Sequence, residues 1–425
     1  MTDTIFALSS GAPPAAIGVV RISGPAAGEA LCALANKLPA PRRAVFRPLS
    51  GRDGALLDRA LVLWLPGPGT ATGEDMVELH LHGGRAVIAA VEGALEALGL
   101  RRATSGEFTR RAFANGRIDL AEAEGLADLL SAETELQRRS AMAMAGGAFS
   151  RQVEDWRERM LVASAAVEAV LDFADEDDVA VLPADFAARL DRLAAEVGEW
   201  LERPRAEMLR DGFRVVLAGP PNSGKSTLFN ALVESEAAIT APIAGTTRDV
   251  LTRPVAIAGV PFLFVDTAGL RDEAGDEIEA IGVARAKGEL GQADLVLWLG
   301  AEDEGPEGGW EIAAQIDRAD HRLDKREPRH RLSAITGEGL AALRDDLVAT
   351  ARTSLPKPGE AALNQRQHTL LGRARAALID ACLDGDPLLI AEHLRIARVA
   401  FDGLIGRATT EDMLDALFGR FCIGK

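Results

Sequence analysis

The sequence contains few cysteines, no long apolar run and fewer basic than acidic side chains. Cys32, Cys382 and Cys422 lie far apart and outside any Cys-x-x-Cys or His-pair spacing, which argues against a disulfide framework and a zinc site. No stretch approaches the roughly 18 consecutive apolar residues of a membrane-spanning helix. The first residues, MTDTIFAL, lack the basic start of a secretory signal. We therefore expect a cytoplasmic protein with no membrane partner.

The charge balance argues against a protein that coats nucleic acid. Lys and Arg number 47 against 64 Asp and Glu, which gives a formal net charge of −17. Such a charge repels phosphate backbones at long range, so any RNA contact must be local. The 425 residues, 48% of them hydrophobic, exceed what one core usually organises and predict two or three globular domains.

The pattern of apolar residues changes along the chain and predicts a multidomain protein of α+β and α/β parts. Short apolar runs and turns come first, followed by long tracts with helical periodicity. The later runs FRVVLA, VPFLFV and DLVLWL are continuously apolar, as in a parallel sheet covered on both faces. Helical tracts flank this α/β part, which favours one helical domain interrupted by an insertion. We predict an α+β domain over 1–117, helical parts over 118–210 and 356–425, and an inserted α/β domain over 211–355.

A phosphate-binding motif opens the α/β part. Gly219-Pro-Pro-Asn-Ser-Gly-Lys-Ser226 fits G-x-x-x-x-G-K-[ST] and lies between an apolar strand and a helical tract, the context that the motif requires. The glycines allow backbone N–H groups to face phosphate, Lys225 neutralises the outer phosphates, and Ser226 offers its hydroxyl to Mg²⁺.

Two further elements predict a nucleotide-operated switch. Asp266-Thr-Ala-Gly269 follows the next apolar strand and matches the D-x-x-G element of GTPases, whose aspartate holds magnesium through water. Between the two motifs, Gly245-Thr-Thr-Arg-Asp249 supplies a threonine that can complete the magnesium shell when the third phosphate is present.

The base-recognition element departs from the N-K-x-D sequence expected for guanine, because the chain offers Asp317-Arg-Ala-Asp320. Asp320 can accept two hydrogen bonds from the guanine edge, and the Arg318 stem can cover the base. Aspartate at position 317 cannot donate as asparagine does. Ser333-Ala334, after a basic strand, fits the remaining base-contacting element, and we favour GTP over ATP.

The hydrolytic machinery also differs from that of Ras-type proteins, because Leu270 after Gly269 cannot orient water as glutamine does. Glu279, within the acidic segment RDEAGDEIE, is our candidate for positioning the water nucleophile. The side-chain oxygen of Asn222, with backbone carbonyls of the first switch, can hold a monovalent cation where other GTPases insert an arginine finger.

Nearly the whole chain resembles the bacterial tRNA modification GTPase family MnmE, also called TrmE, of the TrmE-Era-EngA-YihA-Septin-like GTPases. Besides the GTPase elements, the resemblance is carried by GVVRISG (18–24), TGEDMVE (72–78) with HLHGG (80–84), GEFTRRAF (106–113), NGRIDL (115–120) and the terminal FCIGK (421–425). The resemblance implies an N-terminal folate-binding α+β domain that mediates dimerisation, a discontinuous helical domain and an inserted Ras-like G domain.

The resemblance also implies a reaction. Members act on tRNA with the flavoprotein MnmG (GidA) and add an aminomethyl or carboxymethylaminomethyl group to carbon 5 of the wobble uridine. The carbon comes from a tetrahydrofolate derivative, either 5-formyl- or 5,10-methylene-tetrahydrofolate. GTP hydrolysis, which requires Mg²⁺ and is promoted by K⁺ and by pairing of two G domains in a homodimer, drives conformational change.

The same resemblance implies that Arg21, Glu78 and Arg117 contact the folate and that Lys425 reaches it from the chain end. Arg117 stands where the family has lysine and keeps the charge without the point-like geometry. Arg21 and Glu78 are alternatively a surface strand pair, and His82 either polarises a ligand or is a satisfied loop histidine. Cys422 is either a participant in the modification chemistry or a small buried thiol.

The resemblance also implies metal ligands and nucleotide contacts. The ligands of Mg²⁺ would be Ser226 and Thr247, and those of K⁺ would be Asn222, Thr246 and the carbonyls of Ala241 and Ile243. The nucleotide would be contacted by Asn222, Ser223, Gly224, Lys225, Ser226, Thr227, Ala241, Pro242, Ile243, Ala244, Gly245, Thr246, Thr247, Asp266, Thr267, Ala268, Gly269, Asp317, Arg318, Asp320, Ser333 and Ala334.

Two other functions use the same α/β part. A ribosome-assembly GTPase of the Era type would need a basic RNA-binding module, whereas this acidic chain carries the folate-like motifs. A regulatory scaffold would arise if the altered 317–320 element impaired guanine binding, and GTP turnover in potassium against sodium separates it from the enzyme.

Overall fold

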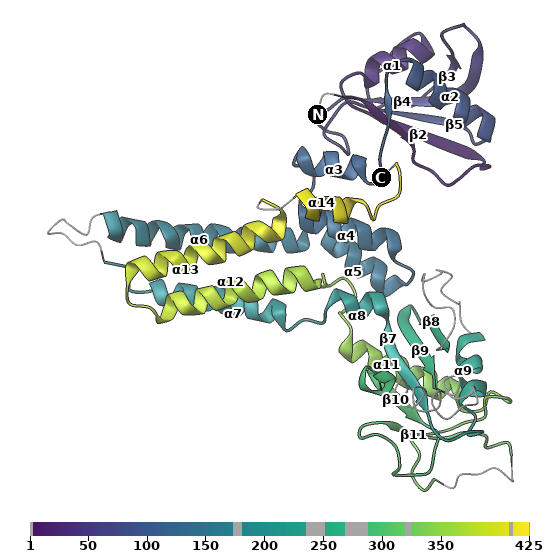
Figure 1. The fold of residues 1–425 in the computed structure, drawn as a ribbon, viewed down its shortest axis with the longest axis vertical. Helices are drawn as coiled ribbons and strands as arrows, with labels where there is room; N and C mark the ends of the chain where they lie inside the picture. The colour runs from purple at the N-terminus through teal and green to yellow at the C-terminus, as the bar shows by residue number, and fades with distance from the viewer. Residues whose placement is uncertain are drawn as a thin grey trace, which may run out of the picture. The chain divides into compact units, whose positions relative to one another are not determined.

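The computed structural model describes residues 3–172, 181–234, 251–267, 288–318, 325–407 and 411–424 (Figure 1). It divides into two compact units. The first contains Met1–Ala127, Ser150–Glu154 and Phe401–Lys425, and the second contains Asp128–Phe149 and Asp155–Ala400. The division into four segments at 117, 210 and 355 stays a prediction, because these two units do not test it. None of the helices in the described part of the chain combines the length and apolar character that a bilayer crossing needs.

The first unit is built on a six-stranded sheet of order β3-β4-β5-β2-β1-β6, in which β6 alone runs parallel to its neighbour. Along β2, Gly18, Val20 and Ile22 are buried, as the two-residue period of a strand requires. Helices α1 and α2 pack into one apolar core with the sheet. The bounds are β1 Ile5–Leu8, β2 Ile17–Ser23, α1 Ala27–Ala35, β3 Val45–Ser50, β4 Leu56–Leu65, β5 Met76–His82, α2 Arg85–Ala97 and β6 Arg101–Arg102.

Helices from both ends of the chain pack together in the first unit. These are α3 (Glu107–Ala114), α4 (Leu120–Ser131), which continues into the second unit from Asp128, and α14 (Glu411–Phe418). Their shared core includes Leu120 and Phe418. Gly106, before α3, has φ +68, and a Cβ there would lie 2.1 Å from the Phe418 carbonyl oxygen. Only glycine therefore fits the start of this motif.

Two helices of the second unit, α5 and α12, begin at capping boxes. Thr134 forms a capping box with Gln137, and Asn364 forms one with Gln367. The helices are α5 Glu135–Ala145, α6 Ala148–Asp172, α7 Phe186–Leu201, α8 Ala206–Asp211, α12 Gln365–Leu383 and α13 Pro387–Ile405, of which α6 and α13 cross the boundary between units. The aromatic rings of Phe149 and Trp156 lie 5.1 and 6.1 Å from the ring of Trp200.

The remaining part of the second unit is an α/β sheet of order β12-β11-β10-β7-β9-β8. All neighbours are parallel except the β8–β9 hairpin, which confirms the parallel sheet predicted from the continuously apolar strands. The bounds are β7 Phe213–Ala218, α9 Lys225–Glu234, β8 Leu251–Ile257, β9 Val260–Asp266, β10 Leu295–Trp298, β11 Trp310–Ala313, β12 His330–Arg331 and α11 Leu340–Ser354.

The β8–β9 hairpin is attached to the helical part of the same unit through its turn. The Leu136 N–H, in the first turn of α5, donates to the Gly259 carbonyl at 3.2 Å. The buried Leu136 side chain joins the apolar core that contains Ile257 and Val260. Gln137 Nε2 donates to the Leu209 carbonyl at 2.8 Å. The hairpin and α5 therefore share a packed, hydrogen-bonded contact.

Candidate functional site

The predicted phosphate loop connects β7 to α9, the strand-loop-helix context that the motif requires. Gly219 (φ +148), Asn222 (φ +60) and Gly224 (φ +94) adopt positive φ, and a Cβ on Gly219 would lie 3.0 Å from the Gly300 nitrogen. Glycine at position 219 therefore lets the loop approach the end of β10. Left-handed residues placed among right-handed ones can turn the backbone N–H groups of a loop toward an anion.

Two polar side chains of the loop are suited to phosphate. The buried Lys225 Nζ donates to the carbonyls of Gly219 and Pro220 at 3.0 and 2.7 Å, which holds the ammonium group over the loop. Ser223 Oγ is buried and has no hydrogen-bond partner in the described part of the chain. A buried hydroxyl without a partner is costly unless a ligand supplies one. The positive end of α9 adds to this anion-binding character.

The predicted magnesium residues that the structure describes lie together. Ser226 Oγ donates to Asp266 Oδ2 at 2.7 Å. Asp266 ends β9, directly opposite Leu217 of β7, and its side chain is fully buried. Thr267 Oγ1 donates to the Leu217 carbonyl at 2.8 Å, which ties the end of β9 to β7. A hydroxyl and a carboxylate are the hard oxygen donors that Mg²⁺ prefers.

The base-side loops follow β11 and β12 at the same edge of the sheet. Gln315, which the sequence analysis missed, donates from Nε2 to the Asn222 carbonyl at 3.1 Å. Its neighbour Ile316 donates from N–H to the Leu332 carbonyl at 3.4 Å, next to the predicted Ser333. Asp317 and Arg318 follow as exposed residues. The sequence signal for Gln315 is its position two residues after the short apolar strand 310–313 and two residues before Asp317.

Several predicted residues lie outside the described ranges. Of the predicted potassium ligands, the structure describes Asn222 alone. The predicted site residues of all kinds that lie outside the described ranges are Ala241, Pro242, Ile243, Ala244, Gly245, Thr246, Thr247, Ala268, Gly269, Glu279, Asp320 and Lys425.

Arg21 and Glu78 face each other across β2 and β5. They are register partners, and Arg21 Nε and Nη2 both donate to Glu78 Oε1, at 3.2 and 3.0 Å. The other oxygen, Oε2, lies 3.5 Å from His80 Nε2. The cross-strand pairing raised as the alternative is therefore present. His82 is likewise paired, because its Nδ1 lies 2.7 Å from Asp58 Oδ1.

The segment before the last residue contacts the end of β1, the strand next to β2. Ser9 Oγ donates to the Gly424 carbonyl at 2.9 Å, and a Cβ on Gly424 (φ +94) would lie 2.4 Å from the Leu8 carbonyl oxygen. Leu8 is adjacent to Ala7, the register partner of Arg21 on β1. Cys422 is exposed, so the buried-thiol alternative is wrong.

Arg117 belongs to the segment that contacts the loop before β5. A Cβ added to Gly73 of the TGEDMVE motif would lie 3.2 Å from Arg117 Cγ and 3.0 Å from Asn115 Cβ. Arg117 is itself exposed. The structure thus places the Arg117 stem against a motif residue while its guanidinium remains accessible.

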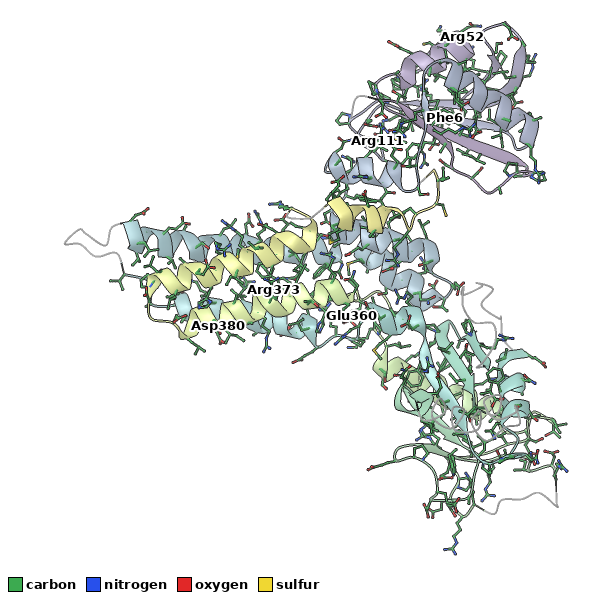
Figure 2. All side chains as sticks on the ribbon, in the orientation of Figure 1. Phe6, Arg52, Arg111, Glu360, Arg373 and Asp380 are labelled. Carbon is green, nitrogen blue, oxygen red and sulfur yellow. The ribbon has the colours of Figure 1, made fainter. Side chains whose placement is uncertain are left out.

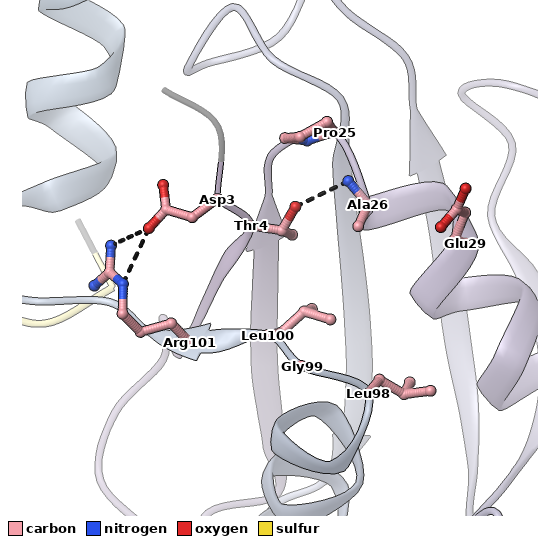
Figure 3. Close-up of a pocket in the computed structure, with 9 residues that line it drawn as sticks. All are labelled: Asp3, Thr4, Pro25, Ala26, Glu29, Leu98, Gly99, Leu100 and Arg101. Carbon is pink, nitrogen blue, oxygen red and sulfur yellow. Dashed lines mark hydrogen bonds and ion pairs between the residues drawn. The ribbon is translucent and has the colours of Figure 1, made fainter.

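An ionic cluster, made of Asp3, Glu74, Arg101, Glu107 and Arg111, joins the segments around β1, β5, β6 and α3; the Arg111 side chain is fully buried in it, whereas those of Asp3 and Arg101 are 46% and 47% exposed. Arg111, on α3, is 0% exposed and contacts Asp3, Glu74 and Glu107 at 2.9, 3.1 and 3.1 Å (Figure 2). Arg101 donates to Asp3 and Glu107, and Figure 3 shows its guanidinium facing the Asp3 carboxylate. Burial alone would raise the pKa of Glu107, but hydrogen bonds from Arg101, the Thr104 N–H and Arg111 lower it to about 2.

A cavity of about 440 Å³ lies beside this cluster, between the start of α1 and the end of α2 (Figure 3). Its lining includes Asp3, Glu29 and Arg101 but none of the predicted folate or nucleotide residues. The ion pairs of Arg111 with Glu74 and Glu107 join α3 to the loop before β5.

Comparison with known proteins covers almost the whole chain. Residues 4–117 match the model described as GTP-binding protein TrmE N-terminus, and residues 120–422 match the MnmE helical domain. The tRNA modification GTPase MnmE of Novosphingobium aromaticivorans is 66% identical over 438 residues, and that of Erythrobacter litoralis is 64% identical over 424 residues, with 100% of both chains covered in each case. Among solved structures, the G domain of the T. maritima FeoB iron transporter covers 32% of this chain and 98% of that domain, at 26% identity and a TM-score of 0.23. The predicted fold class, with an N-terminal α+β domain, a discontinuous helical domain and a G domain, is confirmed.

Proposed function

The chain belongs to the MnmE family of tRNA modification GTPases, and from this membership we propose that it couples potassium-stimulated GTP hydrolysis to modification of the tRNA wobble uridine. The observation that supports this most is the phosphate loop with its neighbouring Ser226–Asp266 pair. At this place Lys225 supplies an ammonium group and Ser226 a hydroxyl, and Asp266, at the end of the neighbouring strand β9, supplies a carboxylate.

The nucleotide-binding residues divide by charge. Lys225 and the N–H groups at the start of α9 would hold the phosphates, since both carry positive potential. Ser226 would bind Mg²⁺ directly, with Thr247, while Asp266 acts through water. When bound, Mg²⁺ neutralises charge on the outer phosphates. The present Ser226–Asp266 hydrogen bond supports this division, because it keeps the two oxygen donors at one place.

Hydrolysis would use a cation and a glutamate in place of an arginine finger and a glutamine. Asn222 would hold K⁺ through its side-chain oxygen, with Thr246 and the carbonyls of Ala241 and Ile243. Glu279 would orient the attacking water, because Leu270 carries no polar group. We propose that pairing of two G domains in a homodimer brings these groups into their working arrangement.

Modification would be performed with the flavoprotein MnmG, which together with this chain adds an aminomethyl or carboxymethylaminomethyl group to carbon 5 of the uridine. A tetrahydrofolate derivative would supply the carbon. Its pterin ring has N–H donors that suit the Glu78 carboxylate, and its glutamyl carboxylates suit Arg21, Arg117 and Lys425. Docking of Gly424 beside Leu8 supports this grouping, since it brings the chain end next to the β2 position of Arg21. Exposed Cys422 is available for the chemistry.

A cytoplasmic location and action on tRNA follow from the same proposal. The Era-type alternative gains no support from the N-terminal part, because residues 4–117 match the TrmE N-terminus. That alternative also predicts a different product, since a ribosome-assembly factor leaves the chemistry of wobble uridines unchanged.

Mass spectrometry of wobble uridines tests the biological role. Cells that lack this protein should lose the C5 substituent, and wild-type protein should restore it, whereas Lys225→Ala should not. Unchanged uridines in the deleted strain would overturn the proposal. GTP turnover in K⁺ against Na⁺ tests the enzymatic part, and equal rates would remove potassium from it.

Folate binding has its own test. Calorimetry with 5-formyl-tetrahydrofolate should show weaker binding for Arg21→Met than for wild type. Arg59→Met, which removes an exposed arginine of the same sheet, should bind like wild type. Equal affinities for all three proteins would overturn the assignment of Arg21.

A further inference from the structure

We infer that the outer edge of the first unit's sheet, at strand β3, holds the anticodon arm of the tRNA, an inference that rests on the proposed function. The segment 4–117 contains 13 Lys and Arg against 9 Asp and Glu, a formal charge of +4, and the total of −17 leaves −21 for the rest of the chain. An RNA backbone is repelled by the acidic remainder and attracted to this segment. A surface for RNA is therefore expected within it.

The positive charge of this segment is concentrated before and within β3. Residues 30–52 contain five cations and no carboxylate. We call four of these cations the basic edge, because β3 is the outermost strand of its sheet (Figure 1). They are Lys37, Arg42, Arg43 and Arg47. None of the four forms an ion pair in the described part of the chain, and the first three are exposed. Their charges are therefore available to phosphate groups.

Two of these arginines are positioned by the fold. The Arg42 N–H donates to the Trp64 carbonyl at 2.8 Å, and its Nη2 donates to the Gly69 carbonyl at 2.6 Å. Arg47 is half-buried, and its Nε is buried without a hydrogen-bond partner among the described residues. A buried donor without a partner is costly, and an anion beside the guanidinium lowers that cost. Side chains already held in place also lose less entropy when a ligand binds.

An aromatic side chain lies within the basic edge. Phe46 is 63% exposed and is the register partner of Leu61, which in turn pairs with His80 of β5. The unpaired bases of RNA loops stack on exposed aromatic rings, and neighbouring cations hold the phosphates. The wobble uridine belongs to such a loop, the anticodon loop. The combination of Phe46 with the basic edge therefore fits the anticodon arm better than it fits an RNA duplex.

The position of Phe46 also suits the proposed chemistry. Phe46 lies on the same face of the sheet as His80, and Glu78 lies two residues from His80 on the same strand, so it shares that face. Two strand spacings, about 10 Å, separate β3 from β5. A base stacked on Phe46 would thus lie on the sheet face that carries the Arg21–Glu78 pair, to which the folate is assigned. The RNA and the one-carbon donor would meet on one face of a single sheet.

The experiment measures binding of the full chain to a fluorescent RNA hairpin that carries an anticodon loop with a wobble uridine, by anisotropy over a range of KCl concentrations. Lys37→Gln/Arg43→Gln should bind roughly 10- to 50-fold more weakly in about 0.1 M salt, because each lost phosphate contact lowers the slope of log affinity against log salt by about 0.7 to 0.9. The control, Arg352→Gln/Lys357→Gln, removes the same charges from exposed positions of the second unit and should bind like wild type.

The stacking contact is tested at Phe46. Phe46→Leu keeps an apolar side chain but removes the ring, so it should lower the affinity at least about fivefold with an unchanged salt slope. Phe46→Trp keeps a stacking surface and should bind at least as tightly as wild type. Equal affinities for Phe46→Leu and wild type would overturn this contact.

Three results would overturn the inference as a whole. One is wild-type affinity in Lys37→Gln/Arg43→Gln, and self-association of that variant would then show that the charges only protect an edge strand, as charges and prolines commonly do. Another is the absence of hairpin binding by the wild-type chain. The third is displacement of the hairpin by poly-glutamate as readily as by unlabelled RNA, which would indicate an acidic protein partner. Failure of the proposed function is seen separately, because wild-type protein would then not restore the C5 substituent in cells.

Discussion

Replacement of Arg111 by methionine should selectively destabilise the first unit. The Arg111 guanidinium is fully buried and contacts Asp3, Glu74 and Glu107. Methionine fills similar volume but leaves Arg101 as the one remaining cation of the cluster, and Arg101 reaches Asp3 and Glu107 but makes no described contact with Glu74. Removing one partner from a buried ion pair costs about 3 to 5 kcal/mol, because the other charge stays buried. We expect a loss of that size for Arg111→Met.

Hydrogen exchange of the full chain measures this loss locally, through the opening free energy of the peptides that contain β1, β2 and β5. Arg102→Met is the matched control, because Arg102 pairs with Glu92 and Glu96 while 55% exposed, and such pairs contribute at most about 1 kcal/mol. The difference between Arg111→Met and wild type should narrow toward acidic pH, where the orphaned carboxylates become protonated. Equal protection in the two variants at neutral pH would refute the reasoning.

Four further outcomes follow from individual residues. Glu107 has a folded-state pKa of about 2 against an ordinary 4.5. Its ionised carboxylate therefore contributes at most about 3 kcal/mol to the free energy of unfolding, which is present above pH 5 and lost as the pH falls toward 2. Glu107→Gln should flatten the pH dependence of the unfolding free energy in urea titrations, and an unchanged dependence would contradict the low pKa. Lys225→Ala should abolish GTP binding in calorimetry with an unchanged circular dichroism spectrum, whereas the exposed Lys357→Ala should bind normally. Glu279→Ala should lower the rate of GTP hydrolysis at unchanged GTP affinity, and an unchanged rate would exclude Glu279 as the water-positioning residue. Leu136→Ala should cost about 2 to 5 kcal/mol in thermal unfolding, because the deleted side chain is buried between α5 and the β8–β9 hairpin.

The parts of the fold that sequence predicted are those set by local periodicity. The spacing of Val153, Trp156, Met160, Ala163, Val167 and Val170 predicted a buried helical stripe; the first five are buried, and Val170, near the end of α6, is partly exposed. The continuously apolar strands likewise predicted a covered parallel sheet. Long-range pairings leave no such local signal, so the parallel contact of β6 with β1 was not predicted.

The candidate site divides in the same way. The phosphate loop was predictable because its residues are contiguous and their spacing is fixed by the phosphates. The ionic cluster was not, because Asp3, Glu74 and Arg111 come from three separate segments and each charge alone resembles a solvated surface residue. Gln315 was not predicted, because its left-handed backbone and its hydrogen bond to the Asn222 carbonyl leave no motif in the sequence.

The Arg21–Glu78 pair illustrates why a strand pair and a ligand site are compatible interpretations of the same residues. Within the described residues, Arg21 donates from Nε and Nη2, and both groups donate to one oxygen of Glu78. Three of its five N–H donors lie beyond those two bonds. Glu78 keeps Oε2 as a second acceptor, at 3.5 Å from His80 Nε2. A ligand with both donors and acceptors can therefore bind without breaking the pair, and the pair holds the two side chains in fixed orientations before the ligand arrives, which lowers the entropic cost of binding.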